Sequence, residues 1–209
     1  MTKNTYLKIQ KTARLTWVKG SDVQAKKLLI VLHGYGQLST FFSRKFSEMQ
    51  TNGHDIVIPE GLHRFYLAGS AGRVGASWMT KEEREADIAD NHAYLSEILK
   101  IYCSEYEEFS ILGFSQGGAT AARFHCENPA LFKSLILWAS IFPPDVESPE
   151  TSLKGRNNYF VLGTQDEYFS IEKQKEVLNL HKELEMNVIS FDGGHDIQKD
   201  VLESILINI

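Results

Sequence analysis

The fold is decided by the segment Ile111-Leu112-Gly113-Phe114-Ser115-Gln116-Gly117-Gly118-Ala119. A Gly-x-Ser-x-Gly pattern lies there between an apolar run and a stretch of helical character. A serine in this pattern occupies a tight strand-to-helix turn, and the flanking glycines let neighbouring backbone approach without a Cβ clash. The turn raises the hydroxyl above the carboxyl edge of a sheet and points the N–H of Gln116 toward a developing oxyanion. Ser115 is therefore the candidate nucleophile.

Outward from this segment, apolar runs alternate with helical stretches along the whole chain. Continuous apolar runs are typical of strands buried on both faces, and they occur at Leu28–Leu32, Asp55–Pro59, Phe109–Gly113, Ser134–Ala139, Asn158–Gly163 and Asn187–Phe191. Helices are expected between and after them, at Thr40–Met49, Lys81–Tyr102, Gly117–Glu127, Ile171–Leu184 and Ile197–Leu206. This alternation predicts an α/β fold with a mainly parallel sheet and helices on both faces. Alternating residues at Thr5–Gln10 and Ala13–Val18 predict an antiparallel hairpin at its N-terminal edge.

Length and composition favour one ordinary globular domain. The chain has 209 residues, 43% of them hydrophobic and 23% charged, so we expect a single domain over residues 1–209 with no room for a cap domain. The formal net charge of −5 argues against nucleic acid and against stable membrane association. Cys103 and Cys126 are too few for a disulfide framework, and no metal-ligand spacing occurs. Without an apolar leader or an 18-residue apolar stretch, the chain is expected to be cytoplasmic.

A serine nucleophile needs a base and a carboxylate that orients the base, and both are expected on loops after later strands. Asp166 follows the run that ends at Gly163, and His195 follows the run that ends at Phe191. The chain order Ser115, Asp166, His195 is that of an α/β sheet with this turn.

Neighbouring residues offer rivals for both roles. Glu167 or Asp192 could hold the carboxylate role in place of Asp166. His33 ends the first buried strand, but it lies upstream of the serine, so the chain order makes it the wrong base.

The stretch Glu60–Thr80 is too long for an idle loop and is a candidate active-site wall. Aromatic residues in this and other predicted loops are candidate substrate-pocket residues, with ordinary core packing as an equal alternative; they are Tyr35, Phe65, Trp78, Phe142 and Phe169. Such an aromatic loop would also leave an apolar patch for a homodimer.

Together, Leu32-His33-Gly34-Tyr35-Gly36 and Gly113-Phe114-Ser115-Gln116-Gly117-Gly118 resemble the phospholipase/carboxylesterase family of the α/β-hydrolase superfamily, which includes the acyl-protein thioesterases. The resemblance implies Ser115 as nucleophile, His195 as general base and then acid, and Asp166 as the orienting residue. It also implies an oxyanion hole formed by the backbone N–H groups of Tyr35 and Gln116. Members of this family act on carboxylic esters or thioesters and use no cofactor or metal.

The expected function is therefore hydrolysis of small carboxylic esters through a Ser-His-Asp triad and an acyl-enzyme. The sequence departs from the family after Ser77-Trp78, where Met79 and Thr80 replace the usual aromatic residue and aspartate, and around Pro59–Tyr66. These differences would affect the acyl and leaving-group pockets, so the substrate stays open. Lysophospholipase, thioesterase, peptidase and dienelactone-type activities are alternatives on the same triad. A non-catalytic binding protein with this fold is a further possibility.

Overall fold

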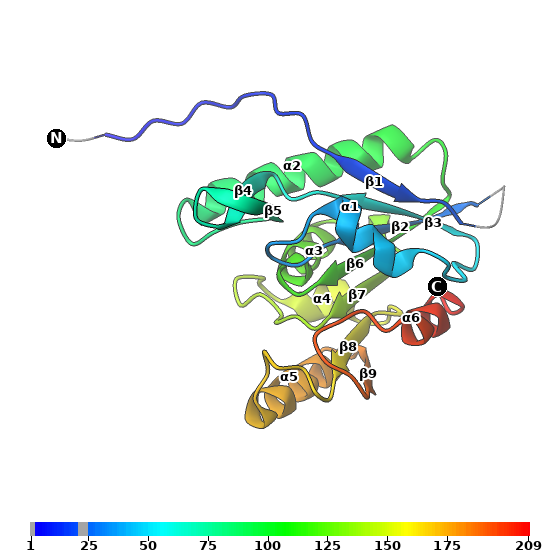
Figure 1. Cartoon of the computed structure of the whole chain (residues 1–209). Coiled ribbons are helices and arrows are strands. Elements are labelled where there is room, and N and C mark those ends of the chain that lie inside the picture. The colour runs from blue at the N-terminus through cyan, green and yellow to red at the C-terminus, as the bar shows by residue number, and fades with distance from the viewer. Residues whose placement is uncertain (1–2, 21–24) are drawn as a thin grey trace.

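A seven-stranded sheet forms the centre of the computed structural model, which describes residues 3–20 and 25–209 (Figure 1). The strand order is β1-β3-β2-β6-β7-β8-β9, and every neighbouring pair is parallel except β1 and β3. The strands are β1 (Leu15–Val18), β2 (Lys27–Leu32), β3 (His54–Pro59), β6 (Glu108–Phe114), β7 (Ser134–Trp138), β8 (Tyr159–Gly163) and β9 (Asn187–Phe191). All residues of β3, β7 and β8 are buried, as their apolar runs predict. The single-domain prediction also included residues 1–2 and 21–24, which lie outside the described residues.

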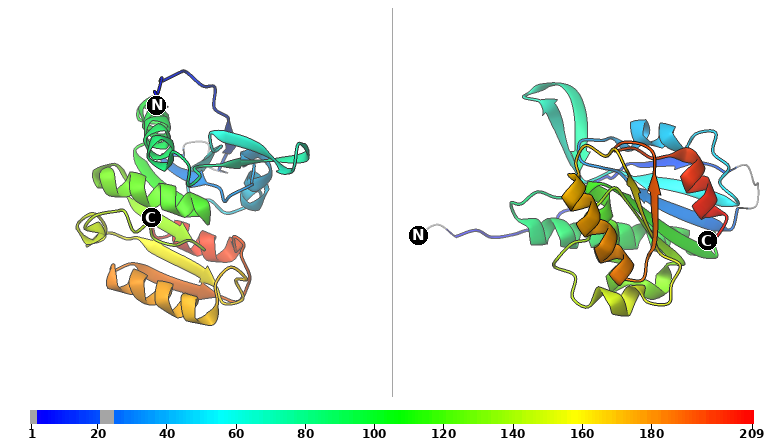
Figure 2. Two further views of the ribbon diagram at one scale, coloured as in Figure 1. Left: turned by 90° about the vertical axis from the view of Figure 1, so that its left-hand side faces the viewer. Right: turned by 90° about the horizontal axis from the view of Figure 1, so that it is seen from below.

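Helices cover both faces of this sheet. Figure 2 shows α2, α3 and α5 on one face and α1 and α6 on the other. Their bounds are α1 (Ser39–Phe42), α2 (Arg84–Tyr102), α3 (Gln116–Glu127), α4 (Pro149–Leu153), α5 (Ile171–Glu183) and α6 (Lys199–Leu206), with 3-10 turns at Ser43–Phe46 and Pro129–Leu131. Among the described residues, no helix combines the length and apolarity needed to cross a membrane.

Two predicted helices differ most from their expected bounds, for local reasons. The helix predicted from Lys81 begins at Arg84, because Glu83 is left-handed with φ 50°. The helix predicted over Thr40–Met49 ends earlier, because Ser47 is extended and Glu48 has φ 62°. The short helix α4 was not predicted.

The predicted N-terminal hairpin is wrong in one of its two strands. β1 forms the antiparallel edge by pairing with β3, with Leu15 opposite Pro59. Thr5–Gln10 forms no strand and leaves the body of the protein as an extended segment (Figure 1). Its large apolar side chains are exposed, Leu7 at 86% and Ile9 at 79%. The alternation in this segment therefore has no buried surface of the described chain to cover.

The predicted loop Glu60–Thr80 is instead largely a β-hairpin. β4 (His63–Ala68) and β5 (Ala71–Ser77) form a separate two-stranded antiparallel sheet. Gly69, with φ 58°, lies in the turn between them. The hairpin projects from the body of the molecule (Figure 2), and an isolated bridge between Gln37 and Ala76 joins its base to the segment that follows β2.

Candidate active site

Ser115 lies on a strained turn between β6 and α3. Its φ of 53° and ψ of −118° are rare for a residue with a side chain. The Ser115 N–H donates to the carbonyl of Trp138 at 2.9 Å, which ties the turn to the end of β7. A Cβ on Gly113 would come within 2.4 Å of the Gly118 Cα, and one on Gly117 within 2.4 Å of the Leu32 carbonyl oxygen. The glycines therefore permit the close packing that holds the serine in this conformation.

Asp166 and His195 meet beyond the carboxyl ends of β8 and β9. The Nδ1 atom of His195 lies 2.7 Å from Oδ2 of Asp166. The Asp166 side chain is fully buried and the His195 side chain is 12% exposed. The Tyr168 N–H donates to the other Asp166 oxygen at 3.0 Å and fixes the carboxylate. With Nδ1 held in this way, the Nε2 atom of His195 is the nitrogen available to a reacting group.

The rival carboxylates contact other groups. Glu167 accepts a hydrogen bond from the backbone N–H of His195 at 3.3 Å, and Asp192 accepts one from the Gln165 side chain at 2.6 Å. Of these carboxylates, Asp166 is the one that contacts the imidazole in the described structure.

Phe114 connects the serine turn to the imidazole of His195. The Phe114 ring lies 4.8 Å from the imidazole, centroid to centroid, and Phe114 directly precedes Ser115. The Tyr168 ring lies on the imidazole at 4.5 Å. Within the described residues, the Ser115 hydroxyl makes no hydrogen bond to His195. Such contacts are often long in the absence of substrate and tighten when it binds.

A tight turn at Gly34–Gln37 lies against Ser115. A Cβ on Gly34 would be 3.2 Å from the Ser115 Cβ. The Gln37 N–H closes the turn on the Gly34 carbonyl at 3.3 Å, and Gly36 takes a φ of 73° that favours glycine. Tyr35, whose N–H is a candidate oxyanion donor, is thus next to the glycine that touches the serine.

His33, just before this turn, is a buried structural histidine. Its Nδ1 lies 2.8 Å from the Gly34 carbonyl oxygen, and its Nε2 accepts the Gly61 N–H at 2.9 Å. Burial lowers the pKa of His33, so the neutral ring that these two contacts require is favoured. Both ring nitrogens are engaged, which agrees with the expectation that His33 is not the base.

Strand β5 braces the Gly34–Gln37 turn from outside. The Gly36 N–H donates to the Ala76 carbonyl at 2.8 Å, and the Ala76 N–H donates to the Gln37 carbonyl at 3.2 Å. The strand comes so close that a Cβ on Gly75 would lie 2.5 Å from the Gly36 carbonyl oxygen. The position of the turn therefore depends on the hairpin.

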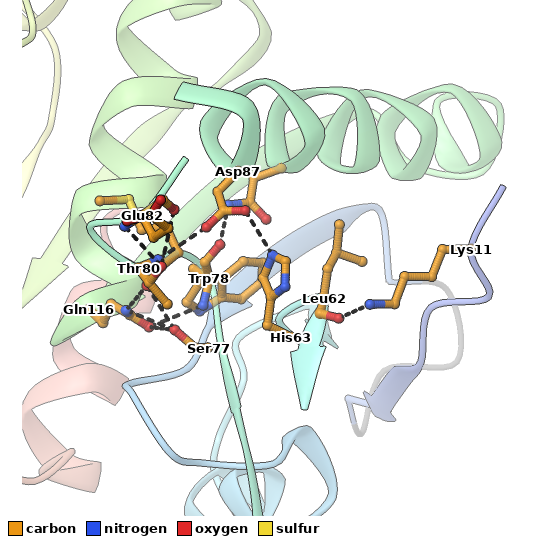
Figure 3. A network of polar contacts seen from close by, with 11 residues as sticks. Lys11, Leu62, His63, Ser77, Trp78, Thr80, Glu82, Asp87 and Gln116 are labelled. Carbon is orange, nitrogen blue, oxygen red and sulfur yellow. Dashed lines mark hydrogen bonds and ion pairs between the residues drawn. The ribbon is translucent and has the colours of Figure 1, made fainter. Parts of the chain in front are cut away.

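The residues after Ala76 also hold Gln116, the other candidate oxyanion donor (Figure 3). Its Nε2 donates to the Ser77 hydroxyl at 3.0 Å and to the Met79 carbonyl at 2.9 Å. Its Oε1 accepts the Trp78 N–H at 3.1 Å. One segment, Gly75–Met79, thus contacts both places where an oxyanion donor is expected.

The predicted pocket aromatics separate into two groups. Trp78 is fully buried and its indole N–H donates to the His33 carbonyl at 2.8 Å, so it packs in the core, which is the alternative that the sequence left open. Phe142 and Phe169 are also buried, at 6% and 8% exposure. Tyr35 and Phe65 lie together with ring centroids 5.0 Å apart, and Tyr35 is 60% exposed. These two remain accessible to a ligand.

A groove between α1 and the β4–β5 hairpin was not predicted. It has a volume of about 540 Å³ and begins at Gly36 and Gln37 of the turn beside Ser115. Its apolar lining comes from Leu38, Phe41, Phe42, Leu67 and Val74. We call this feature the hairpin groove. The apolar residues after the Gly34–Gln37 turn were the one sequence signal for this groove. Its opposite wall comes from the β4–β5 hairpin, which was predicted to be a loop.

The fold and the site together define an α/β hydrolase, with a serine on the turn after β6 and a carboxylate–histidine pair beyond β8 and β9. A family model described as "Serine hydrolase (FSH1)" matches residues 22–201, and the chain belongs to this family. This confirms the resemblance to serine hydrolases of the α/β-hydrolase superfamily that the motifs predicted.

Solved structures with the same fold cover nearly the whole chain. Acyl-protein thioesterase 2 from Zea mays matches with a TM-score of 0.72 and 14% identity, over 94% of this chain and 97% of that chain. A carboxylesterase from Bacillus cereus matches with a TM-score of 0.62 and 18% identity, over 93% of this chain and 92% of that chain. A phospholipase/carboxylesterase from Dyadobacter fermentans matches with a TM-score of 0.63 and 15% identity, over 96% and 99%. A comparison with curated protein sequences gives no significant match.

Proposed function

We propose that this chain is a serine esterase that cleaves carboxylic esters through an acyl-enzyme on Ser115. The observation that carries the proposal is the combination of a strained, glycine-flanked serine and a buried Asp166 held 2.7 Å from His195. Membership in a serine hydrolase family supports the reaction class. The finer assignment, to small carboxylic esters, rests on the geometry of this site.

In the first half-reaction, the Ser115 hydroxyl attacks the ester carbonyl carbon while Nε2 of His195 takes its proton. Asp166 holds the imidazole in the tautomer with its proton on Nδ1 and stabilises the imidazolium that forms. The tetrahedral oxyanion accepts hydrogen bonds from the backbone N–H groups of Tyr35 and Gln116. When the intermediate collapses, the C–O bond to the alcohol breaks, and the alcohol leaves with the proton held on His195.

In the second half-reaction, water attacks the acyl-serine carbonyl and gives its proton to His195. A second tetrahedral intermediate forms in the same oxyanion hole. Its collapse releases the carboxylic acid and returns the proton to Ser115. The reaction consumes one water for each ester, and these side chains suffice for every proton transfer.

The hairpin groove supports binding of an apolar group next to the reacting carbonyl. It begins at Gly36 and Gln37, adjacent to Tyr35, and its volume of about 540 Å³ is that of a small-molecule site. An acyl chain in this groove would start at the Gly34–Gln37 turn, which lies beside Ser115. This feature favours esters of medium-length acyl groups over acetyl esters.

An ester panel tests the proposal. We expect 4-nitrophenyl esters to be hydrolysed by the native chain and not by Ser115→Ala, with the melting temperature of the variant showing that it is folded. The panel includes thioesters, because the same attack applies to a thioester carbonyl and a structural neighbour is named an acyl-protein thioesterase. Lysophospholipid and dienelactone substrates test whether the triad serves a lysophospholipase or a dienelactone-type hydrolase. Equal activity in Ser115→Ala would refute the proposal, and inactivity of the native chain on every ester would favour a binding protein.

A further inference from the structure

The hairpin groove is bordered by cations. Lys45 and Arg73 belong to its lining, and the residues that line it include no carboxylate. The Arg44 guanidinium lies over the Phe41 ring, 4.8 Å from its centroid, at the same wall. The chain as a whole carries a formal net charge of −5. The groove therefore has a local charge opposite to that of the protein.

The two cations of the lining differ in their partners. Lys45 is paired with Asp196, the residue after His195. Arg73, on β5 near the end of the hairpin, has no carboxylate partner among the described residues. A guanidinium at the edge of an apolar surface is suited to a carboxylate, which it can bind through two parallel hydrogen bonds.

We propose that the hairpin groove binds the acyl chain of a substrate whose far end carries a carboxylate, with Arg73 as the residue that recognises it. This substrate class, half-esters of dicarboxylic acids, rests on the proposed esterase function. The apolar walls contact the methylene chain, and the cationic border meets the terminal carboxylate.

The groove is assigned to the acyl side of the ester because of where each product group must lie. The acyl carbon is held between Ser115 and the oxyanion donors, and the groove begins at Gly36 and Gln37, directly after Tyr35. The oxygen of the leaving alcohol must reach Nε2 of His195, which protonates it. The alcohol is therefore expected on the imidazole side of the acyl carbon, and the acyl chain on the side of Tyr35 and Gly36.

The test compares three aryl esters of eight-carbon acids. Mono-4-nitrophenyl suberate and 4-nitrophenyl octanoate have acyl chains of equal length and differ in a terminal carboxylate or methyl group. 4-Carboxyphenyl octanoate carries its carboxylate on the alcohol instead. We expect kcat/KM for the suberate to exceed that for the octanoate about fivefold at low ionic strength, the effect of one exposed ion pair. Added salt should reduce this ratio.

Arg73→Glu is the decisive variant, because it replaces attraction by repulsion. The ratio of kcat/KM for suberate over octanoate should fall at least tenfold in this variant. The matched control is Lys175→Glu, an equal charge change at an exposed position on α5, on the opposite face of the sheet (Figure 2). It should leave the ratio as in the native chain. Melting temperatures of both variants show whether they are folded.

Distinct results separate the failure of this inference from failure of the esterase proposal. The carboxylate subsite is overturned if the ratio of kcat/KM for suberate over octanoate is near one and Arg73→Glu does not change it. In that case, hydrolysis of the octanoate still supports the esterase proposal. A preference for the carboxylate on the alcohol side would overturn the acyl-side assignment. No turnover of any of the three esters by the folded native chain, or equal turnover by Ser115→Ala, would refute both proposals.

Discussion

The side chain of Gln116 offers a sharp test of how the oxyanion hole is positioned. Its amide makes one hydrogen bond of 2.9 to 3.1 Å to each of three residues, Ser77, Trp78 and Met79, and its Oε1 also lies 3.2 Å from the Ser77 hydroxyl. Gln116→Met keeps the length of the side chain and removes all of these contacts. At about 1 kcal/mol for each bond, and with water able to replace part of them at this half-buried position, the variant should lose about 1 to 2 kcal/mol of unfolding free energy.

The effect on catalysis should be larger than this stability loss implies. Complete loss of one oxyanion donor costs about 3 to 4 kcal/mol of barrier. The Gln116 backbone N–H remains in the variant but is no longer positioned by the side-chain hydrogen bonds. We therefore expect kcat to fall about 10- to 50-fold, less than the loss of a whole donor would cause. KM should change little, because the oxyanion forms after substrate binds. Steady-state kinetics on a 4-nitrophenyl ester measures both, and the affinity for a trifluoromethyl ketone should fall in parallel with kcat.

Asn158→Leu is the matched control. Its side chain also joins a backbone N–H, that of Leu135 at 2.8 Å, to a backbone carbonyl, that of Leu153 at 3.2 Å. It lies just before β8, at the amino-terminal ends of the parallel strands, whereas Ser115 lies at their carboxyl ends. The control should lose at least as much stability and keep its kcat. The reasoning is refuted if Gln116→Met keeps the native kcat, or if both variants lose kcat in proportion to their loss of stability.

Three more variants and one control probe the triad, the contact of β5 with the Gly34–Gln37 turn, and the core. Asp166→Asn should lower kcat about 10³- to 10⁴-fold with little change in KM, because the imidazole loses the carboxylate that sets its tautomer; a loss under tenfold would contradict the proposed role. Gly75→Ala should lower kcat at least tenfold, because the added Cβ displaces the Gly34–Gln37 turn. Gly69→Ala is the control and should retain kcat, because a Cβ there meets nothing within 4 Å. Equal kcat in the two variants would argue that β5 does not position the turn. Burial lowers the pKa of His125 to about 4, so protonation of the unfolded chain reduces stability as pH falls from about 6.5 to 4. In His125→Phe, the unfolding free energy lost between about pH 6.5 and 4 should be smaller by up to about 3 kcal/mol, as measured by denaturant titrations. An unchanged pH dependence would show that this histidine does not cause the loss.

The buried parts of the fold were predictable because their patterns have a direct physical cause. Strands such as Leu28–Leu32 are covered on both faces, so their sequences are continuously apolar. The edge was less predictable. Thr5–Gln10 alternates like a strand yet pairs with no strand of the described chain, because alternation alone specifies no partner. Glu60–Thr80 folds as a hairpin whose outer side chains are exposed, and its composition gave no buried face by which to recognise it.

The candidate site divides in the same way. Ser115, Asp166 and His195 follow strand ends, and topology places such positions at one edge of the sheet. The support of the site was not predictable, because it arises from contacts between distant segments. The bond of Gln116 to Met79 spans 37 positions, and the hairpin groove has one wall from each of two such segments.

The measurement that tests the central proposal most directly is stoichiometric labelling with a fluorophosphonate, followed by mass spectrometry of the intact protein and its peptides. We predict one adduct per native chain, located on Ser115, with no labelling of Ser115→Ala and much slower labelling of His195→Gln. Labelling at a different residue, or a native chain that stays unlabelled while folded, would contradict the assignment of Ser115 as the activated nucleophile.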